Sequence, residues 1–480
     1  MSQALVLALD IGTSSARAAL FTQRATIITA SLHQQHYQAR TDANGAFEIN
    51  PRVLLRAVAG CIDGVLAWHL ANAANRTIEV VGADCFWHSL IGTTTTGKPT
   101  TAIMTWADTR GAHAARQLSE SIDGPDYHAR TGCMLHASFW PAKHQFLKQQ
   151  MRGEYRQTAF WMSPAEWITW QFTGIRQCAH GMATGTGLYD PCKLSWDHAL
   201  LEQLQIPIET LSPLSDALIE PSHKLATRWP ALRNVPWVAA IGDGIASNLG
   251  CGATSAPYAA INYGTSAAVR IVKRGSKANA PYGMFAYRID QQRYLLGGAI
   301  SNAGNLYQWA QTHLRIPTDP IQFEKQLARQ TSRAHGLTVL PFWNGERAPY
   351  WHDDLNGSIV GLRQSTTALD IAAALREATL HRLALIAAKL PARGRREAIV
   401  AGGLPPSSLQ LMADVTGLKV RAAGVREASV RGAAVFALER LGQSQIPPPR
   451  WGKLITPNRE RQAYFRSERR RHEALERLLR

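Results

Sequence analysis

Two short segments, one near the start of the chain and one past its middle, repeat the same pattern. Residues 9–18 read Leu-Asp-Ile-Gly-Thr-Ser-Ser-Ala-Arg-Ala, and residues 262–271 read Asn-Tyr-Gly-Thr-Ser-Ala-Ala-Val-Arg-Ile. Each is an apolar run, a Gly-Thr-Ser turn and a second apolar run, which predicts two strands joined by a tight turn. Because such a turn presents backbone N–H groups and hydroxyls, it can bind phosphate oxygens. One turn in each half predicts a duplicated fold that holds one nucleotide from both sides.

The length of the chain supports this division. Its 480 residues are too many for one hydrophobic core and predict two domains. Strand-like and helix-like segments alternate, which is typical of an α/β protein. We place the boundary at a proline-bounded segment, residues 230–236. The expected parts are an N-terminal domain (1–236), a C-terminal domain (237–445) and a basic tail (446–480).

Local patterns predict individual elements. Pro51 stands where a first-turn proline opens a helix, and Ser163-Pro164-Ala165-Glu166 is a helix start signal. The expected strands are residues 4–9, 18–21, 77–83, 237–241, 294–296, 337–340 and 398–400. The expected helices are residues 51–72, 161–172, 245–249, 305–313, 368–390 and 408–416.

Composition narrows the cellular setting. No apolar run approaches the ~18 residues of a membrane span, so we expect no membrane partner. The first expected strand begins almost at Met1 and leaves no room for a secretory signal. The six cysteines form no C-x-x-C pair, which argues against a zinc site or a disulfide framework. The expected location is therefore the reducing cytoplasm.

The formal net charge of +17 favours anionic partners. A basic surface attracts nucleotides or acidic sugars, and it can also bind nucleic acid. Much of the charge lies in the tail, where Glu and Arg are mixed and Leu475, Leu478 and Leu479 have roughly helical spacing. This pattern favours a solvated terminal helix. A nucleic-acid-binding function is therefore only a remote alternative.

Two aspartates stand at the ends of expected strands. Asp10 comes directly before the first turn, where a carboxylate could hold Mg²⁺ against phosphate oxygens or only bond its own turn. Asp243 lies between two glycines, after an apolar run and before an expected helix. There it could accept a proton from a substrate hydroxyl or cap the helix.

Aromatic and charged residues suggest a polyol pocket. Trp87 and His88 follow the expected strand 77–83, and Trp106, Asp108 and Arg110 alternate along a short segment. If that segment is extended, its three side chains share one face. A core tryptophan beside a surface ion pair is the alternative interpretation.

Taken in order, these motifs make the chain resemble the FGGY family of carbohydrate kinases. The motifs are Asp-Ile-Gly-Thr-Ser (10–14), Trp-Ala-Asp-Thr-Arg (106–110), Gly-Asp-Gly (242–244), Tyr-Gly-Thr-Ser (263–266), Gly-Gly (402–403) and Ala-Ser-Val-Arg-Gly-Ala-Ala (428–434). The resemblance extends to about Gly442. Local runs such as residues 297–302 and 340–349 look closest to the gluconokinase/xylulokinase-like branch.

The resemblance implies two ribonuclease-H-like domains of the actin-like ATPase fold, with a central cleft. It implies ATP-dependent phosphorylation of a sugar or sugar-acid hydroxyl, with Asp243 as general base and Asp10 associated with Mg²⁺. The implied ATP-binding residues are Gly12, Thr13, Ser14, Arg17, Gly264, Thr265, Gly304, Gln308, Gly402 and Gly403. The implied substrate-binding residues are Trp87, His88, Trp106, Asp108 and Asp243.

Departures from the family pattern keep a second function open. Residues 404–409, Leu-Pro-Pro-Ser-Ser-Leu, make the turn after Gly403 about two residues shorter than is usual for the family. Cys85-Phe86-Trp87 replaces the usual Gly-Gln-Met before His88. A catalytically weakened, sugar-binding pseudokinase or regulator is therefore the alternative, although the retained Asp10 and Asp243 argue against it. A homodimer is one assembly that the sequence leaves open.

Overall fold

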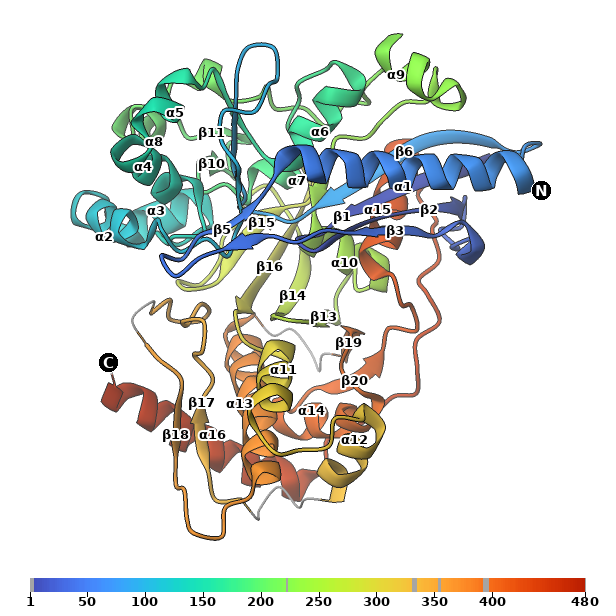
Figure 1. Cartoon of the computed structure of the whole chain (residues 1–480). Coiled ribbons are helices and arrows are strands. Elements are labelled where there is room, and N and C mark those ends of the chain that lie inside the picture. The colour runs from blue at the N-terminus through green and yellow to red at the C-terminus, as the bar shows by residue number, and fades with distance from the viewer. Residues whose placement is uncertain (1–3, 222, 330–334, 353–354, 392–396, 480) are drawn as a thin grey trace.

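Two β-sheets organise the molecule, as the computed structural model shows for residues 4–221, 223–329, 335–352, 355–391 and 397–479 (Figure 1). The first sheet has the strand order β12-β6-β1-β2-β3 and the second has the order β15-β16-β14-β13-β19-β20. The first contains β1 (Ala4–Ile11), β2 (Ser15–Thr22), β3 (His33–His36), β6 (Thr77–Cys85) and β12 (Ile241–Gly242). The second contains β13 (Tyr258–Tyr263), β14 (Ala267–Arg274), β15 (Phe285–Arg288), β16 (Arg293–Ile300), β19 (Glu397–Gly402) and β20 (Lys419–Ala422).

The two sheets share one topology. In the first, β12, β6 and β1 run parallel, and β1, β2 and β3 then pair antiparallel. In the second, β20, β19 and β13 run parallel, and β13, β14 and β16 then pair antiparallel. Each Gly-Thr-Ser turn joins the first antiparallel pair of its sheet. The expected duplication and the two-domain α/β class are confirmed.

Helix α1 (Pro51–Asn72) covers the first sheet and has the predicted bounds. The side chain of Asn50 accepts hydrogen bonds from the backbone N–H groups of Arg52 and Val53, and Pro51 opens the first turn. Among the described residues, α1 alone is long and apolar enough to cross a membrane by length and composition. One face of α1 is nevertheless buried and packs against β2 and β3, as in a core helix.

Helices α10 (Asp243–Cys251) and α15 (Ala428–Arg440) pack closely against each other, and α15 also packs on β1 and β6. Glycines make this approach possible. A Cβ atom on Gly432 would lie 1.7 Å from the carbonyl oxygen of Ala246, and one on Gly250 would lie 1.7 Å from that of Ala428. Helix α15, from the end of the chain, and strand β12 therefore both pack with the first sheet. The expected domain boundary between residues 236 and 237 stays a prediction.

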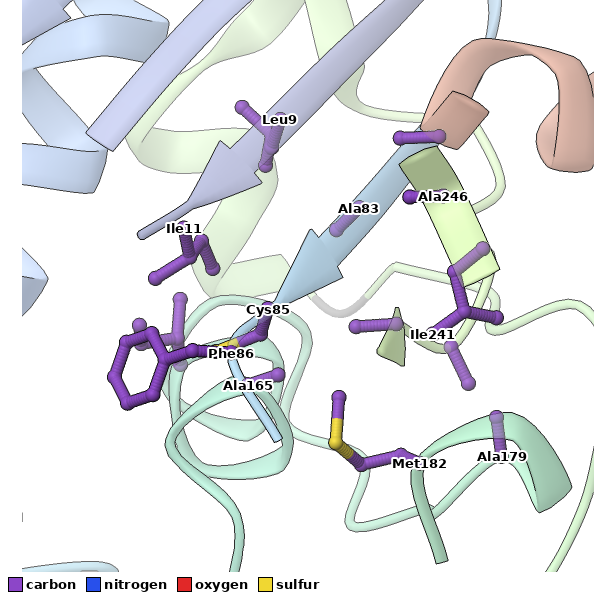
Figure 2. Close-up of a cluster of buried hydrophobic side chains, with 14 of the residues drawn as sticks. Leu9, Ile11, Ala83, Cys85, Phe86, Ala165, Ala179, Met182, Ile241 and Ala246 are labelled. Atoms are coloured by element: carbon purple, nitrogen blue, oxygen red, sulfur yellow. The ribbon is translucent and has the colours of Figure 1, made fainter. Parts of the chain in front are cut away.

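A buried apolar cluster supports the ends of β1 and β6 (Figure 2). Leu9 and Ile11 of β1 and Cys85 of β6 pack with Met182 of α7 (His180–Ala183) and Ala165 of α6 (Pro164–Thr173). Asp10 lies between two of these core residues, so close packing fixes the strand that carries it.

The helix expected at residues 161–172 begins later than predicted. Trp161 belongs to β9 (Phe160–Met162), which pairs with β7 (Ile91–Thr93). Helix α6 starts after Ser163 because Ser163 and Glu166 bond each other's backbone N–H groups in a capping box. The strand expected at 237–241 is reduced to β12, because Trp237 makes only isolated bridges.

Four predicted elements of the second half form to within a few residues of their expected bounds. They are α11 (Gly304–His313), β17 (Thr338–Leu340), α13 (Ala368–Lys389) and α14 (Leu409–Thr416). The sequence does not predict α12 (Pro320–Arg329) or β18 (Ser358–Val360). The other elements of the first half are β4 (Arg40–Thr41), β5 (Phe47–Ile49), β8 (Ile103–Met104), α2 (Ala112–Ser121), α3 (Gly124–Thr131), α4 (Trp140–Gln150), α5 (Arg152–Gln157), β10 (Tyr189–Asp190), β11 (Ser195–Trp196), α8 (His198–Gln203) and α9 (His223–Arg228).

The basic tail ends in the predicted helix, α16 (Arg459–Leu479), but this helix is not solvated on every side. Its residues Phe465, His472 and Glu476 are buried, and the helix packs against α14 and β17. These three residues are spaced by seven and four positions and therefore share one helical face. The prediction of a solvated helix is wrong for that face, which is part of the second domain's core.

Candidate active site

Each Gly-Thr-Ser turn is closed by a backbone hydrogen bond from its glycine, although the first turn is one residue longer than the second. In the first, the N–H of Gly12 donates to the carbonyl oxygen of Ser15 at 3.0 Å. In the second, the N–H of Gly264 donates to the carbonyl oxygen of Ser266 at 2.9 Å. Thr265 is exposed at the tip of its turn. Both turns therefore present hydroxyls and backbone to the space between the sheets.

Helix α11 begins directly on the second turn. The N–H of Gly304 donates to the carbonyl oxygen of Gly264 at 2.8 Å, and that of Ala303 donates to Thr265 at 3.1 Å. A Cβ atom on Gly304 would lie 2.6 Å from the oxygen of Gly264, so a side chain there would push the helix away. A helix N-terminus beside a turn of this kind favours bound phosphate.

One cavity of about 380 Å³ brings both turns together. It unites most of the residues that the sequence predicts for the site, in a space between β1, β6, α10 and β14. The predicted residues that line it are Asp10, Gly12, Thr13, Ser14, Arg17, Trp87, His88, Trp106, Asp243, Gly264, Thr265 and Gly402.

A second cavity of about 370 Å³ shares Gly264 and Thr265 with the first. It contains the remaining predicted nucleotide residues, Gly304, Gln308 and Gly403. Its other walls are largely apolar or aromatic, with Tyr307 and Phe323 in edge-to-face contact at 5.1 Å between ring centroids. The arrangement suits a flat base in the second cavity and its phosphates over the shared turn.

Asp10 lies at the end of β1 with an arginine on one side and a second carboxyl group on the other. Arg17 Nη1 lies 3.1 Å from Asp10 Oδ2 and 3.5 Å from Glu427 Oε2. Asp84 of β6 is directly beside Asp10 in the parallel register and has no exposed surface. Burial raises the pKa of both carboxyl groups, and the neighbouring charge of Asp10 raises the pKa of Asp84 further.

The residues around Asp10 fit a magnesium ion that arrives with a nucleotide. Among the residues that the structure describes, no group of three His, Cys, Asp or Glu side chains is arranged to hold a metal. Mg²⁺ typically needs only one or two carboxylates when phosphates and water supply the other ligands. Asp10, facing a cavity lined by both turns, meets that requirement.

Asp243 is the first residue of α10 and not its N-cap, which is Gly242. Its Oδ1 accepts a hydrogen bond from the N–H of Gly244 at 2.8 Å. Burial raises the pKa of Asp243, and the nearby guanidinium of Arg270 acts in the opposite direction. Asp243 therefore combines access to the cavity with a pKa above that of an ordinary carboxylate, as a general base requires.

Trp87 forms one wall beside Asp243. Its indole Nε1 donates to the carbonyl oxygen of Gly181 at 2.9 Å, which fixes the ring. The ring lies so close to α10 that a Cβ on Gly242 would be 1.8 Å from its Cε2, and one on Gly244 would be 2.5 Å from its Cζ3. The two glycines that flank Asp243 are thus required by the tryptophan.

His88 has a left-handed backbone, with φ of 65°, and its Nδ1 lies 2.6 Å from the carbonyl oxygen of Gly185. This short hydrogen bond requires the Nδ1–H tautomer. Burial, with a further contribution from Arg347, lowers the pKa of His88 well below its usual value. His88 is therefore neutral at physiological pH.

Trp106 and Asp108 do not lie on one extended face, because residues 106–107 form a turn. Trp106 lines the main cavity, whereas Asp108 lines neither cavity. The Asp108 carboxylate is buried and pairs with Arg110 at 2.6 Å, and it also accepts a hydrogen bond from the N–H of Phe47 at 3.2 Å. The structure thus separates Asp108 from the other predicted substrate residues, and a direct substrate contact by Asp108 stays a prediction.

Three charged residues of the site are missed by sequence reasoning: Arg270, Arg347 and Asp84. Arg270 lies within the apolar run after the second turn, and that unexpected charge is an available signal. Its Nη1 donates to Asn262 Oδ1 at 2.9 Å, and its Nε is buried without a hydrogen-bond partner among the described residues. Arg347 comes from a distant segment, and nothing local predicts its position in the cavity.

Two family models, two sequence relatives and one solved structure that match this chain all belong to carbohydrate or glycerol kinases. Residues 5–250 match the N-terminal domain, and residues 259–439 the C-terminal domain, of the FGGY family of carbohydrate kinases. A gluconokinase from Bacillus subtilis is 25% identical over 91% of this chain and 88% of its own length. A glycerol kinase from Acidovorax is 28% identical over 90% of this chain and 89% of its own. The crystal structure of a xylulose kinase from Lactobacillus acidophilus superposes with a TM-score of 0.90 at 23% identity, covering 99% of this chain and 98% of that one.

Proposed function

The chain belongs to the FGGY family of carbohydrate kinases, and we propose that it transfers the γ-phosphoryl group of ATP to a hydroxyl of a sugar or sugar acid. The base and ribose occupy the cavity that contains Gly304, Gln308 and Gly403. The triphosphate crosses the shared turn at Gly264 and Thr265 toward the first turn. The sugar lies in the main cavity, between Asp243 and the aromatic wall.

The observation that carries the proposal is the convergence of Asp10, Asp243 and both phosphate-type turns on one cavity. Asp243 accepts the proton of the attacking hydroxyl, which makes that oxygen a better nucleophile. Thr13, Ser14 and Thr265 orient the phosphates with hydroxyl and backbone donors. Mg²⁺, when bound with the nucleotide near Asp10, neutralises phosphate charge.

The charge of the sugar end favours an acidic substrate. Arg270 and Arg347 both line the main cavity. Asp243 is the carboxylate with the largest electrostatic effect on Arg270. Arg17 is already paired with Asp10 and Glu427. A polyhydroxy carboxylate would bind this surplus of positive charge, with its carbon chain against the faces of Trp87 and Trp106.

The alternative of a pseudokinase rests on the short turn after Gly403, and the surroundings of that turn support nucleotide binding instead. Leu404 and Pro405 line the second cavity. Ser407 Oγ donates to Glu324 at 2.8 Å, and Arg376 donates to Ser408 Oγ at 2.7 Å. These hydrogen bonds fix the turn, so that it forms a rigid side of the cavity proposed for the adenine ring.

The expected setting is that of a soluble cytoplasmic enzyme. All six cysteines are free thiols, as in proteins of a reducing compartment. Its substrates are small molecules, and nucleic acid is not among the partners that we propose. Assembly as a homodimer stays a prediction.

Substitution of Asp243 by asparagine tests the catalytic role directly. We expect sugar-dependent ADP formation to fall by about 10²- to 10⁴-fold, the usual contribution of a general base. Calorimetry should show unchanged affinity for ATP, because the nucleotide cavity does not contain Asp243. Asp126→Asn, which alters an exposed ion pair with Arg130, is the matched control. Turnover at the wild-type rate in the Asp243→Asn variant would contradict the assignment.

A further inference from the structure

Arg347 reaches the main cavity from the second half of the chain and meets residues of the first half there. Its guanidinium carbon lies 5.8 Å from the ring centroid of Trp106 and 5.3 Å from that of Trp351. These distances are within the range of cation–π contact. The head group therefore contacts two aromatic rings at the wall of the cavity that also contains Asp243.

The preceding residue, Glu346, organises the backbone around Arg347. Its Oε1 accepts a hydrogen bond from the N–H of Tyr350 at 3.3 Å, and its Oε2 accepts one from the N–H of His352 at 3.1 Å. The side chain of Glu346 is almost wholly buried. One carboxylate therefore closes the segment 346–352 into a defined loop, with Arg347 at its start.

Glu346 is tied to the C-terminal helix through one arginine. Arg382 of α13 bonds Glu346 through Nη2, and its Nη1 lies 2.6 Å from Oε2 of Glu476 on α16. The exposed fractions of the Arg382, Glu346 and Glu476 side chains are 5%, 1% and 2%. Ion pairs that are buried to this degree have strongly directional hydrogen bonds, and removing one of the three charged groups leaves a buried charge without its partner.

Apolar packing joins the same elements. Leu475, next to Glu476 on α16, packs against a cluster of Leu340, Phe342 and Leu355. The ring of Phe342 also lies under the Arg382 guanidinium, at 5.1 Å. Figure 1 shows α16 passing by β17, which precedes this loop, and the two elements are in contact.

We infer that Arg347 binds the sugar substrate and that the C-terminal helix sets its position through Glu476, Arg382 and Glu346. Arg347 is the substrate-contacting residue, whereas the other three are positioning residues. The inference rests on the proposed function, because it names a further contact in the same substrate site. It gives the basic tail a role in sugar affinity and none in nucleotide binding, since neither Arg347 nor the three positioning residues line the nucleotide cavity.

Glu476→Gln is the informative substitution, because it removes one charge and keeps the volume of the side chain. We expect KM for the sugar to rise by about tenfold, the effect of misplacing one charged hydrogen bond. KM for ATP should stay within about twofold. Glu468→Gln is the matched control on the same helix, where Glu468 pairs with the exposed Arg471 at 3.1 Å, and it should change neither constant.

A double-mutant cycle distinguishes positioning from a general loss of stability. Arg347→Ala should raise KM for the sugar at least as much as Glu476→Gln does. Adding Glu476→Gln to Arg347→Ala should then have little further effect, because the residue that it positions is gone. Additive effects, or an equal rise in KM for ATP, would overturn the inference.

Amide hydrogen exchange supplies a readout that does not depend on turnover. In Glu476→Gln the N–H groups of Tyr350 and His352 should exchange faster, because Glu346 loses its fixed partner. Unchanged exchange at both amides would overturn the positioning role even if the kinetic constants changed. A wild-type enzyme that phosphorylates no sugar would instead contradict the proposed function, so the two failures are distinguishable.

Discussion

Replacing Asp84 by asparagine should change how the stability of this enzyme depends on pH. Asp84 has no exposed surface, and its two carboxyl oxygens have no hydrogen-bond donor among the described residues. Burial and the neighbouring Asp10 and Asp243 raise its pKa well above the usual value. The folded protein therefore keeps a proton that the unfolded chain loses once the pH passes about 4.

The sign and size of the effect follow from this difference. Because the folded state binds more protons, the free energy of unfolding falls as the pH rises from about 4 up to the raised pKa of Asp84. The slope approaches about 1.4 kcal/mol per pH unit for one group. The substituted asparagine cannot titrate, so the variant lacks this slope. Its amide can also donate a hydrogen bond to Asp10.

Thermal unfolding of wild type and Asp84→Asn, followed by calorimetry at a series of pH values without nucleotide, measures the effect. The difference in Tm should grow with pH, by about 3–6 °C per pH unit for a domain of ~250 residues. Asp84→Ala is the control, because it removes the titrating group but leaves a small cavity and no donor to Asp10. It should share the altered pH slope at a lower overall Tm. Parallel Tm curves for wild type and Asp84→Asn would show that Asp84 does not keep a proton in the folded protein.

Two further substitutions test the surroundings of Asp243. Arg270→Gln removes the positive charge that opposes the raised pKa of Asp243, so the acid limb of the kcat profile should move to higher pH. Arg270→Lys keeps the charge and should move the limb less. An acid limb that stays in place in Arg270→Gln would count against Asp243 as the base. Gly242→Ala places a methyl group against Trp87, which should cost about 1–3 kcal/mol of stability and most of the activity. Adding Trp87→Ala to this variant should restore part of the lost stability. Additive losses in the double variant would show that the Trp87 ring is not the reason for a glycine at position 242.

Features with local signals can be predicted from the sequence. The bounds of α1 follow from its Asn50 cap and Pro51, and both Gly-Thr-Ser turns form the expected hairpins. The topological match of the two sheets confirms the duplication that the repeat predicts. Asp10 and Asp243 can be singled out because each lies beside or close to a glycine at the end of a strand.

Features that depend on distant residues cannot be predicted in the same way. Local pattern assigns Trp161 to a helix because its pairing partner in β7 is far away in the sequence. The buried face of α16 packs on α14 and β17, and its Glu476 pairs with Arg382, which lies 94 residues earlier in the sequence. Alternation groups Asp108 with Trp106, but a turn and the pairing with Arg110 place its carboxylate elsewhere.

The two Gly-Thr-Ser turns have different neighbours, which suggests that the two halves have divided the work. Asn262 of β13 comes two residues before its turn, as Asp10 of β1 does. Each accepts a hydrogen bond from an arginine of the following strand, Arg270 and Arg17 respectively, but Asn262 carries an uncharged amide where Asp10 carries a carboxyl group. The second turn supports the start of α11 beside the nucleotide cavity. The first turn lies beside Asp10 and Arg17.

Transfer of labelled phosphate from ATP to a sugar tests directly whether this protein is a sugar kinase with Asp243 as its base. The enzyme is incubated with Mg²⁺ and ATP carrying a radioactive γ-phosphate, together with aldonic acids, pentuloses, polyols or hexoses in separate reactions. We expect the label to move to at least one of these acceptors, with the strongest transfer to a sugar acid, and Asp243→Asn to slow this transfer by about 10²- to 10⁴-fold. Label found only in inorganic phosphate, or remaining in ATP with every acceptor, would contradict this expectation.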